Sequence, residues 1–404
     1  MFHGSHMESN IGDTETHYFT LGTARKPFRF STGDEMRDLT VAYETYGTLS
    51  AKKDNAILLF HALSGSQHAA GHTASVSAAG DRWTKDCQSG WWDAFIGPGK
   101  ALDTNKWFVV CANYLGGCYG STGPASTNPA TGRPYGSAFP PVRTSDVVRS
   151  QAALLDHLGI KKLHAVMGAS VGGLLAINFA TMFPERVKIV VPVASGPRTT
   201  VLTRLTLFEQ VMAIENDPHF NGGDYYDSQP PGYGLALARM ISHKTFVHLD
   251  AIERRARADV VQRSDQLSWF QVRHNVESYM LHQGKKFVKR FDANTYLRII
   301  DMWLRFDPLQ DAGVESYAAL FERSKKARHH YLVFSIDSDF CFYPEEQVEL
   351  VSHLETAGVK CMHITVHSNK GHDSFLLEPE LYAPHLVHTL DGRWGQRAER
   401  DLVE

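Results

Sequence analysis

The sequence predicts an α/β protein with a mostly parallel, doubly wound sheet and an inserted helical cap. Short apolar runs, typical of strands buried on both faces, alternate with segments of helical periodicity. These runs occupy residues 55–61, 107–113, 163–167, 188–194, 331–336 and 361–366. Such alternation indicates right-handed β–α–β units and therefore a parallel sheet.

The expected domain boundaries follow from changes in this pattern. Between about residues 198 and 305 the chain shows helical periodicity and many charges but no buried strand. We therefore expect residues 199–305 to be a helical cap over the carboxyl ends of the strands, and residues 8–198 and 306–395 to form the core. Alternating residues in 39–46 favour antiparallel edge strands. Residues 1–7 contain Gly-Ser-His-Met and are interpreted as a cloning remnant.

Composition excludes several classes of partner. The net charge of −3 over 404 residues gives no sign of binding to nucleic acid or to an acidic membrane surface. No apolar run reaches about 18 residues, so we expect no membrane span. No charged-then-apolar leader opens the chain, and its five cysteines are odd in number and lack C-x-x-C spacing. We therefore expect a cytoplasmic protein with reduced thiols.

Sequence motifs for common cofactors are also missing. The chain has no phosphate-binding Gly-x-x-x-x-Gly-Lys-Ser/Thr, no Gly-x-Gly-x-x-Gly in a β–α–β context and no His-Glu-x-x-His. We expect no bound nucleotide triphosphate, NAD or metal. Coenzyme A remains possible as a substrate, because scattered basic groups often hold its adenine end.

Residues 163–176 predict the chemistry of the site. An apolar strand runs into Gly168-Ala-Ser170-Val-Gly172, and an apolar helix follows at once. Such a turn strains the residue at the bend, and the flanking glycines keep side chains away from it. The hydroxyl of Ser170 is thereby presented at a helix N-terminus, where free N–H groups favour a developing oxyanion. We predict that Ser170 is a nucleophile; the alternative is a glycine-rich turn without chemistry.

An activated serine needs a base, and the base needs an orienting group. The strand–turn–helix motif is typical of the α/β-hydrolase fold, in which the order along the chain is serine, acid, histidine. His372 follows the last predicted strand and Gly371, so it is the predicted base. Asp337 and Asp339 both follow the run at 331–336, and spacing does not choose between them. Either could instead stabilise a turn.

Two backbone N–H groups should stabilise the oxyanion. One belongs to Val171, directly after the nucleophile. The other is expected in the loop after the first buried strand, residues 61–65, where Leu63 is the candidate. The alternative for that loop is a tight turn of small residues.

Several longer motifs carry a resemblance to a known family. They are AYETYG (42–47), HALSG (61–65), GWWDAFIGPGK (90–100), NYLGGCYGSTGP (113–124), YGSAFP (135–140), KRFDANTYL (289–297) and GHDSFL (371–376). With these motifs the chain resembles the homoserine O-acetyltransferase family, serine-nucleophile acyltransferases with an α/β-hydrolase fold, from about residue 18 to 392.

The resemblance implies further roles. It implies that Asp339 of the Ser338–Asp339 pair is the acid, that Arg239 clamps the carboxylate of the acceptor, and that Asp373 binds its ammonium. The guanidinium of an arginine suits the bidentate binding of a carboxylate. The family transfers an acyl group by a ping-pong mechanism in methionine biosynthesis, with acetyl-CoA as a substrate and no permanently bound cofactor. Its cap helices form the interface of a homodimer.

Other activities remain open at this stage. L-Serine could replace L-homoserine, because a pocket discriminates one methylene by only about 1–3 kcal/mol. Succinyl-CoA could replace acetyl-CoA as the donor. The same Ser–His–Asp set could also serve a carboxylesterase or another hydrolase.

Overall fold

An eight-stranded sheet forms the centre of the protein. In the computed structural model, residues 11–258 and 267–393 are described, so the predicted cloning remnant lies outside the described residues. The strand order is β1-β4-β6-β5-β7-β8-β9-β10. The strands are β1 (His17–Leu21), β4 (Leu39–Tyr46), β5 (Ala56–Phe60), β6 (Phe108–Ala112), β7 (Leu163–Ala169), β8 (Val187–Val193), β9 (His330–Ile336) and β10 (Lys360–Val366). β1 and β4 are antiparallel to their neighbours, and β5 to β10 are parallel to one another, as the sequence predicts. The expectation of an edge position for residues 39–46 is wrong, because β1 lies outside β4.

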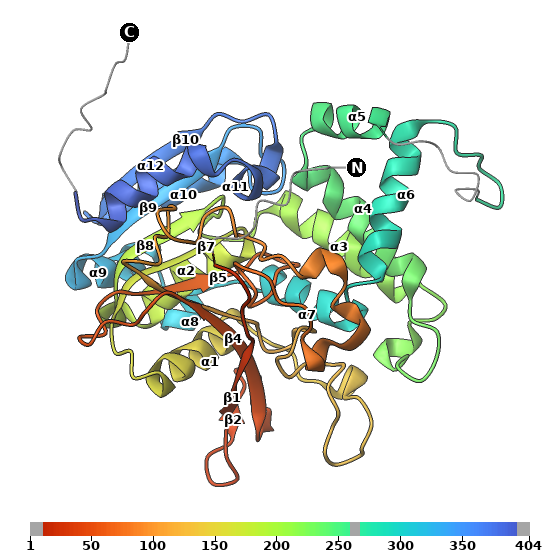
Figure 1. Cartoon of the computed structure of the whole chain (residues 1–404), viewed down its shortest axis with the longest axis horizontal. Coiled ribbons are helices and arrows are strands. Elements are labelled where there is room, and N and C mark those ends of the chain that lie inside the picture. Colours follow the sequence, from red (N-terminus) through yellow and green to blue (C-terminus); the bar gives the residue numbers. More distant parts are fainter. Residues whose placement is uncertain (1–10, 259–266, 394–404) are drawn as a thin grey trace.

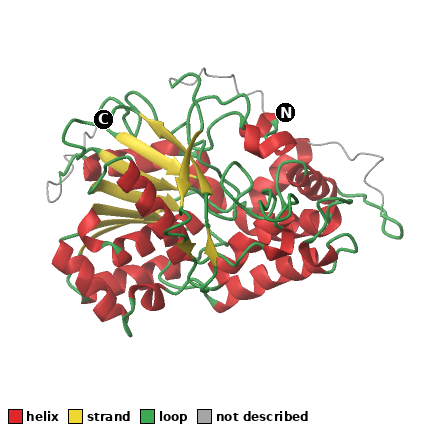
Figure 2. Ribbon diagram, turned by 90° about the horizontal axis from the view of Figure 1, so that it is seen from below, coloured by secondary structure: helices red, strands yellow, loops and turns green. Residues whose placement is uncertain are grey.

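Helices flank this sheet and also form a region beside it. They are α1 (Thr144–His157), α2 (Val171–Met182), α3 (Val201–Glu215), α4 (Gly232–Phe246), α5 (Leu249–Ala258), α6 (Asn275–Val288), α7 (Ala293–Leu304), α8 (Pro308–Ala312), α9 (Tyr317–Ala327), α10 (Pro344–Thr356), α11 (Ser374–Leu377) and α12 (Pro379–Leu390). A separate hairpin pairs β2 (Phe28–Arg29) with β3 (Glu35–Met36). The sheet lies in one half of the molecule and a mostly helical region lies beside it (Figures 1 and 2).

Helices α3 to α7 fall between residues 199 and 305, and we call them the cap helices. α3 packs closely on α4, and α4 on α6. Figure 1 shows α3, α4, α5 and α6 on one side of the sheet, in green and teal, away from α10 and α12. No strand lies among the described residues between 199 and 305.

The sheet is buried on both faces because its central strands carry apolar residues at every position. All of β5 is buried. Successive residues alternate between two core clusters: Leu58 and Phe60 join one, while Ile57 and Leu59 join the other. Each fully buried side chain of this kind contributes about 1.5–3 kcal/mol.

The strand at one edge differs from its prediction. The run at 361–366 has the composition of a fully buried strand, but most residues of β10 are half-buried or exposed. β10 is the last strand of the sheet and pairs only with β9. Burial at this edge is incomplete because no strand among residues 11–258 and 267–393 covers its outer side.

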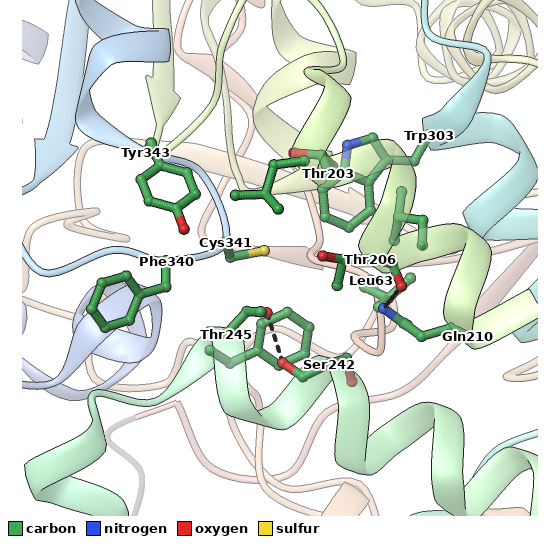
Figure 3. A pocket seen from close by; sticks show the side chains of 13 residues that line it. Leu63, Thr203, Thr206, Gln210, Ser242, Thr245, Trp303, Phe340, Cys341 and Tyr343 are labelled. Carbon is green, nitrogen blue, oxygen red and sulfur yellow. Dashed lines mark hydrogen bonds between the residues drawn. The ribbon is translucent and has the colours of Figure 1, made fainter. Parts of the chain in front are cut away.

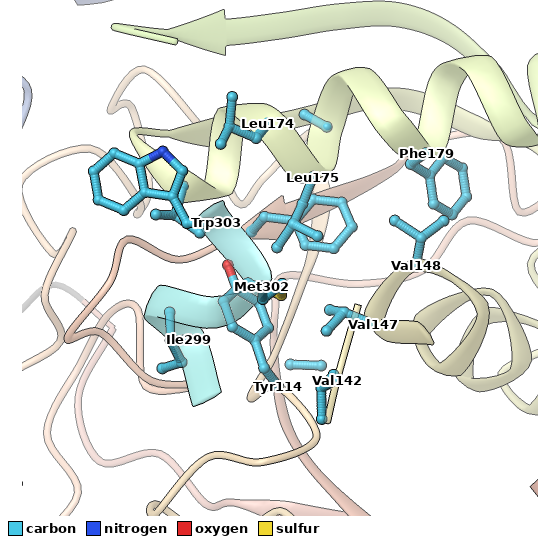
Figure 4. Close-up of a cluster of buried hydrophobic side chains, with 14 of the residues drawn as sticks. Tyr114, Val142, Val147, Val148, Leu174, Leu175, Phe179, Ile299, Met302 and Trp303 are labelled. Atoms are coloured by element: carbon cyan, nitrogen blue, oxygen red, sulfur yellow. The ribbon is translucent and has the colours of Figure 1, made fainter. Parts of the chain in front are cut away.

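Helix α2 links the sheet to the cap. Figure 4 shows Leu174, Leu175 and Phe179 of α2 close to Val148 of α1 and Trp303 of α7. Nearly all of α2 is buried, so this helix has little freedom to shift. Its first turn, which carries the site, is thereby fixed by packing on both sides.

The described residues contain neither a membrane-spanning helix nor a cluster of metal ligands. None of the helices in 11–258 and 267–393 is long and apolar enough to cross a lipid bilayer. Within the same ranges, no three His, Cys, Asp or Glu side chains are grouped as metal ligands would be.

Candidate active site

Ser170 lies at the bend between β7 and α2. Its backbone has φ 59° and ψ −130°, a conformation that costs a non-glycine residue about 1–3 kcal/mol. Two hydrogen bonds hold it there: the Ser170 N–H donates to the carbonyl of Val193 (2.9 Å), and the Ser195 hydroxyl donates to the carbonyl of Ser170 (2.7 Å). The prediction of a strained strand-to-helix turn is confirmed.

Close backbone approach explains the glycines around this serine. A Cβ on Gly168 would lie 2.3 Å from the carbonyl oxygen of Gly172. A Cβ on Gly172 would lie 2.3 Å from the carbonyl oxygen of Phe60, at the end of β5. Only hydrogen fits at both positions, so the first turn of α2 sits directly against β5.

His372 and Asp339 form a buried hydrogen-bonded pair. Asp339 Oδ2 accepts from His372 Nδ1 at 2.6 Å, and both side chains are almost fully buried. The other oxygen, Oδ1, accepts from the backbone N–H groups of Cys341 (2.7 Å) and Phe342 (2.9 Å). These amides fix the carboxylate, and the carboxylate fixes the imidazole so that Nε2 is the free ring nitrogen.

Asp337 has a different environment. Its carboxylate accepts from His367 Nδ1 (2.9 Å) and from the N–H of Ser368 (3.0 Å), and its side chain is 42% exposed. Burial raises the pKa of Asp337, but these hydrogen bonds outweigh it and hold the pKa below its usual value. Of the two aspartates that spacing left open, Asp339 is the one placed against His372.

His372 and Ser170 both line one pocket of about 320 Å³. Among the described residues, His372 Nε2 has no hydrogen-bond partner, so the Ser170–His372 bond is not formed in this structure. Such bonds are often long without substrate and tighten when it binds. The rings of Phe342, Phe375 and Phe246 surround the imidazole, with centroids 5.1–5.9 Å away. This apolar shell limits the access of water to the base.

The loop after β5 meets the first turn of α2 in the same pocket. Leu63 is buried and lines the pocket together with Ser170. Val171 is the first residue of α2, so its N–H has no acceptor within the helix. The loop is anchored at its start, where the hydroxyl of Tyr114 donates to the carbonyl of His61 and the two rings stack at 3.7 Å.

Arg239 and Asp373 bring opposite charges to this pocket. The guanidinium of Arg239 lies over the rings of Phe246 (5.5 Å) and Phe287 (4.9 Å). Burial lowers its pKa, and the positive charge of Arg290 lowers it further. Burial raises the pKa of the Asp373 carboxyl, although the charge of Arg239 opposes this. Within the described part of the chain, neither side chain forms a direct ion pair, so both remain available to a ligand.

Two features of the pocket were not singled out from the sequence. Arg290 lines it beside the loop of Leu63, and Lys286 lines it while paired with Asp86 at 3.0 Å. The sequence feature that could have indicated a role for Arg290 is its place in the motif at 289–297. No local pattern indicates that its side chain reaches a loop more than two hundred residues earlier.

A second, smaller cavity of about 20 Å³ shares Leu63 and Phe246 with the pocket. Figure 3 shows residues that line this cavity. Its wall carries hydroxyl groups from Thr203, Thr206 and Ser242. The indole N–H of Trp303, which also lines it, has no partner among the described residues. The volume and these polar groups suit about one water molecule.

Comparison with known proteins agrees with this geometry at the level of class. Residues 55–379 match the family model described as alpha/beta hydrolase fold. Two solved structures superpose almost equally well. Esterase E22 has a TM-score of 0.82, with 27% identity over 93% of this chain and 100% of that one. A homoserine O-acetyltransferase from Bacillus anthracis has a TM-score of 0.81, with 27% identity over 94% and 98%.

More similar sequences refine the class. A homoserine O-acetyltransferase from Solidesulfovibrio magneticus is 37% identical over 97% of this chain and 96% of its own length. A homoserine O-succinyltransferase from Magnetococcus marinus is 40% identical over 96% and 97%. The chain belongs to the homoserine O-acetyltransferase family of α/β-hydrolase-fold proteins, and it is an enzyme of the acyltransferase class.

Proposed function

We propose that this enzyme transfers an acetyl group from acetyl-CoA to the hydroxyl of L-homoserine through an acyl-serine intermediate. One observation carries the proposal: the pocket that contains Ser170 and His372 also contains Arg239 and Asp373, which form no ion pair within the described residues. A free amino acid brings a carboxylate and an ammonium, which are the two groups that these side chains would bind. The names of the relatives support the choice of acceptor.

In the first half-reaction, Ser170 Oγ attacks the thioester carbonyl and His372 Nε2 takes the hydroxyl proton. The N–H groups of Leu63 and Val171 stabilise the resulting oxyanion. The carbon–sulfur bond then breaks, the thiolate of CoA takes the proton from His372, and the acetyl group remains on Ser170. Asp339 keeps the imidazole in the required tautomer and stabilises its charged form.

In the second half-reaction, the acceptor replaces CoA. Its carboxylate binds Arg239 and its ammonium binds Asp373, which directs its hydroxyl toward the acyl-serine. His372 takes the hydroxyl proton as the oxygen attacks, and returns that proton to Ser170 Oγ as the serine leaves. Transfer exceeds hydrolysis only if water stays out of the pocket, and the phenylalanine rings around His372 serve that purpose.

The decisive experiment measures thiol release from acetyl-CoA and succinyl-CoA, each with L-homoserine, L-serine or water alone. The proposal predicts the fastest release with acetyl-CoA and L-homoserine, and almost none with water. Faster release with succinyl-CoA would show that succinyl-CoA is the preferred donor. Faster release with L-serine would show that L-serine is the preferred acceptor. Substantial turnover by a Ser170→Ala variant would refute the acyl-serine mechanism.

A hydrolase is the second candidate, because esterase E22 superposes as well as the acetyltransferase structure does. An esterase needs the catalytic groups but not a charged pair for an amino acid. If hydrolysis is the native reaction, thiol release should not depend on L-homoserine, and Asp373→Asn should leave release unchanged with or without this acceptor. Under our proposal L-homoserine accelerates thiol release in the wild type, and Asp373→Asn loses this acceleration.

We also propose that the enzyme is a homodimer formed through the cap helices. α3 exposes the apolar side chains of Val201, Leu205, Phe208 and Met212, which recur along one side of the helix. An exposed stripe of this kind marks an interaction surface. Phe208→Glu should convert a dimer to a monomer in sedimentation measurements. A wild-type monomer, or a variant that remains dimeric, would contradict this interface.

The same reasoning gives the cellular context that we propose. Acetylation converts the hydroxyl of L-homoserine into a better leaving group, which suits a step of methionine biosynthesis in the cytoplasm. Acetyl-CoA acts as a substrate in this scheme, and the chemistry uses no permanently bound cofactor.

A further inference from the structure

The active-site pocket contains two guanidinium groups close to one phenylalanine. Arg239 lies 4.9 Å from the ring centroid of Phe287, and Arg290 lies 5.2 Å from the same centroid. Among the described residues, neither arginine forms an ion pair with a carboxylate. Burial is the main cause of the lowered pKa of Arg239, and the like charge of Arg290 lowers that pKa further. An anion bound in the pocket would offset this repulsion.

The charges in the pocket do not balance without a ligand. Lys286 is paired with Asp86, which leaves Arg239, Arg290 and Asp373. A zwitterionic acceptor adds one negative and one positive group, so it would satisfy Arg239 and Asp373 together. Arg290 would still lack an anion.

Arg290 bonds only to neutral oxygen atoms in the described structure. Its Nη1 donates to the carbonyl of Ser64 (3.2 Å) and the hydroxyl of Tyr119 (3.3 Å), and its Nη2 donates to the hydroxyl of Ser64 (3.4 Å). A guanidinium has five N–H donors, so others remain for a ligand. Arg290 is half-buried and lines the pocket.

The position of Arg290 indicates which substrate carries the anion. Arg290 bonds to Ser64, which directly follows Leu63, whose N–H is proposed to hold the oxyanion, so the guanidinium is attached to the loop that would hold the reacting acyl group. We propose that Arg290 is an anion subsite for the acyl donor, which binds a carboxylate or phosphate oxygen of that substrate. This inference rests on the proposed acyl-transfer function.

An acyl donor can offer two kinds of anion, a carboxylate on its acyl group or a phosphate of CoA, and the geometry favours the carboxylate. The far carboxylate of a dicarboxylic acyl group, such as succinyl, lies only a few bonds from the reacting carbonyl. The nearest phosphate of CoA lies beyond the whole pantetheine arm. A guanidinium next to the oxyanion loop therefore fits the carboxylate better, and the subsite would let this enzyme accept dicarboxylic donors.

The experiment compares Arg290→Gln with the wild type on four donors: acetyl and succinyl groups, each carried by CoA or by N-acetylcysteamine. N-acetylcysteamine has no phosphate, so its acetyl thioester is neutral. We expect kcat/KM for both succinyl donors to fall about 10- to 100-fold, the range of a charge-assisted hydrogen bond. The neutral acetyl thioester should change by less than about twofold, and Arg290→Lys should recover part of the loss.

Each remaining outcome has a defined meaning. A loss confined to both CoA donors, whichever acyl group they carry, supports the subsite and assigns it to a phosphate. An equal loss on all four donors, or no loss on any, overturns the inference, because Arg290 then only holds the loop or has no role. Arg305→Gln, an exposed arginine of the cap paired with Asp301, is the matched control and should change nothing. A wild type that releases thiol from no donor refutes the proposed function instead.

Discussion

Replacing Asp339 by asparagine should disable the base without disturbing the fold. The Oδ1 atom of Asp339 already accepts two backbone hydrogen bonds, from Cys341 at 2.7 Å and Phe342 at 2.9 Å. An asparagine carbonyl would keep these bonds, so its NH₂ group would turn toward His372 Nδ1. That nitrogen would then have to accept, which places the proton on Nε2. A protonated Nε2 cannot take the proton of Ser170.

The expected loss follows from this change of tautomer. The bond at 2.6 Å between Asp339 and His372 is buried, and an equivalent substitution in serine proteases lowers kcat about 10⁴-fold. We expect a loss of about 10³- to 10⁴-fold in kcat here. Asp337→Asn is the matched control, because this carboxylate is partly exposed and bonds to the exposed His367. Its effect should stay within about 0.5 kcal/mol.

The assay is steady-state thiol release from acetyl-CoA with L-homoserine at pH 7.5. Thermal unfolding of both variants should show that the fold is intact, with melting temperatures close to that of the wild type. Equal losses in the two variants, or a larger loss in Asp337→Asn, would refute the assignment of Asp339 as the acid.

Three further predictions concern charge. Arg239→Ala should raise the KM for L-homoserine about 10- to 100-fold and leave acylation by acetyl-CoA alone unchanged, as rapid mixing would show; a collapse of acylation would contradict the clamp role. Burial raises the pKa of Asp373 above its ordinary value of 3.8. As the pH is lowered, the carboxylate should therefore become protonated, and the KM for L-homoserine should rise, at a pH above that ordinary value. Asp373→Asn should show a high KM without this pH dependence. Burial raises the pKa of Glu346 to about 8, so its protonated form stabilises the fold and that stability is lost as pH rises from about 4.5 through about 8. Glu346→Gln should therefore increase the free energy of unfolding at pH 8, on the order of a few kcal/mol, and have little effect near pH 4.5; no gain at pH 8 would contradict this.

The central strands were predictable because burial on both faces requires apolar side chains at every position. The run at 55–61 becomes β5 (Ala56–Phe60), and the run at 188–194 becomes β8 (Val187–Val193). The outer position of β10 was not predictable, because composition reports how apolar a strand is and not which strands lie beside it. The strained bend at Ser170 was predictable since it depends on residues within one short motif.

The rest of the site depends on contacts between distant segments. Spacing left Asp337 and Asp339 open, and what separates them is the path of a loop that directs two amides onto Asp339. Arg290 contacts Ser64, which lies 226 positions earlier in the sequence, so no local pattern indicates this contact. The charges of a pocket become visible only when the segments that line it are brought together.

The central claim is that Ser170 carries the acyl group between the two substrates. The most direct measurement is the intact mass of the enzyme after mixing with acetyl-CoA and no acceptor, followed by mapping of the modified peptide. The account predicts one acetyl group on Ser170, removed when L-homoserine is added and absent from Ser170→Ala. A wild-type enzyme that turns over without this adduct, or an equal adduct on Ser170→Ala, would contradict it.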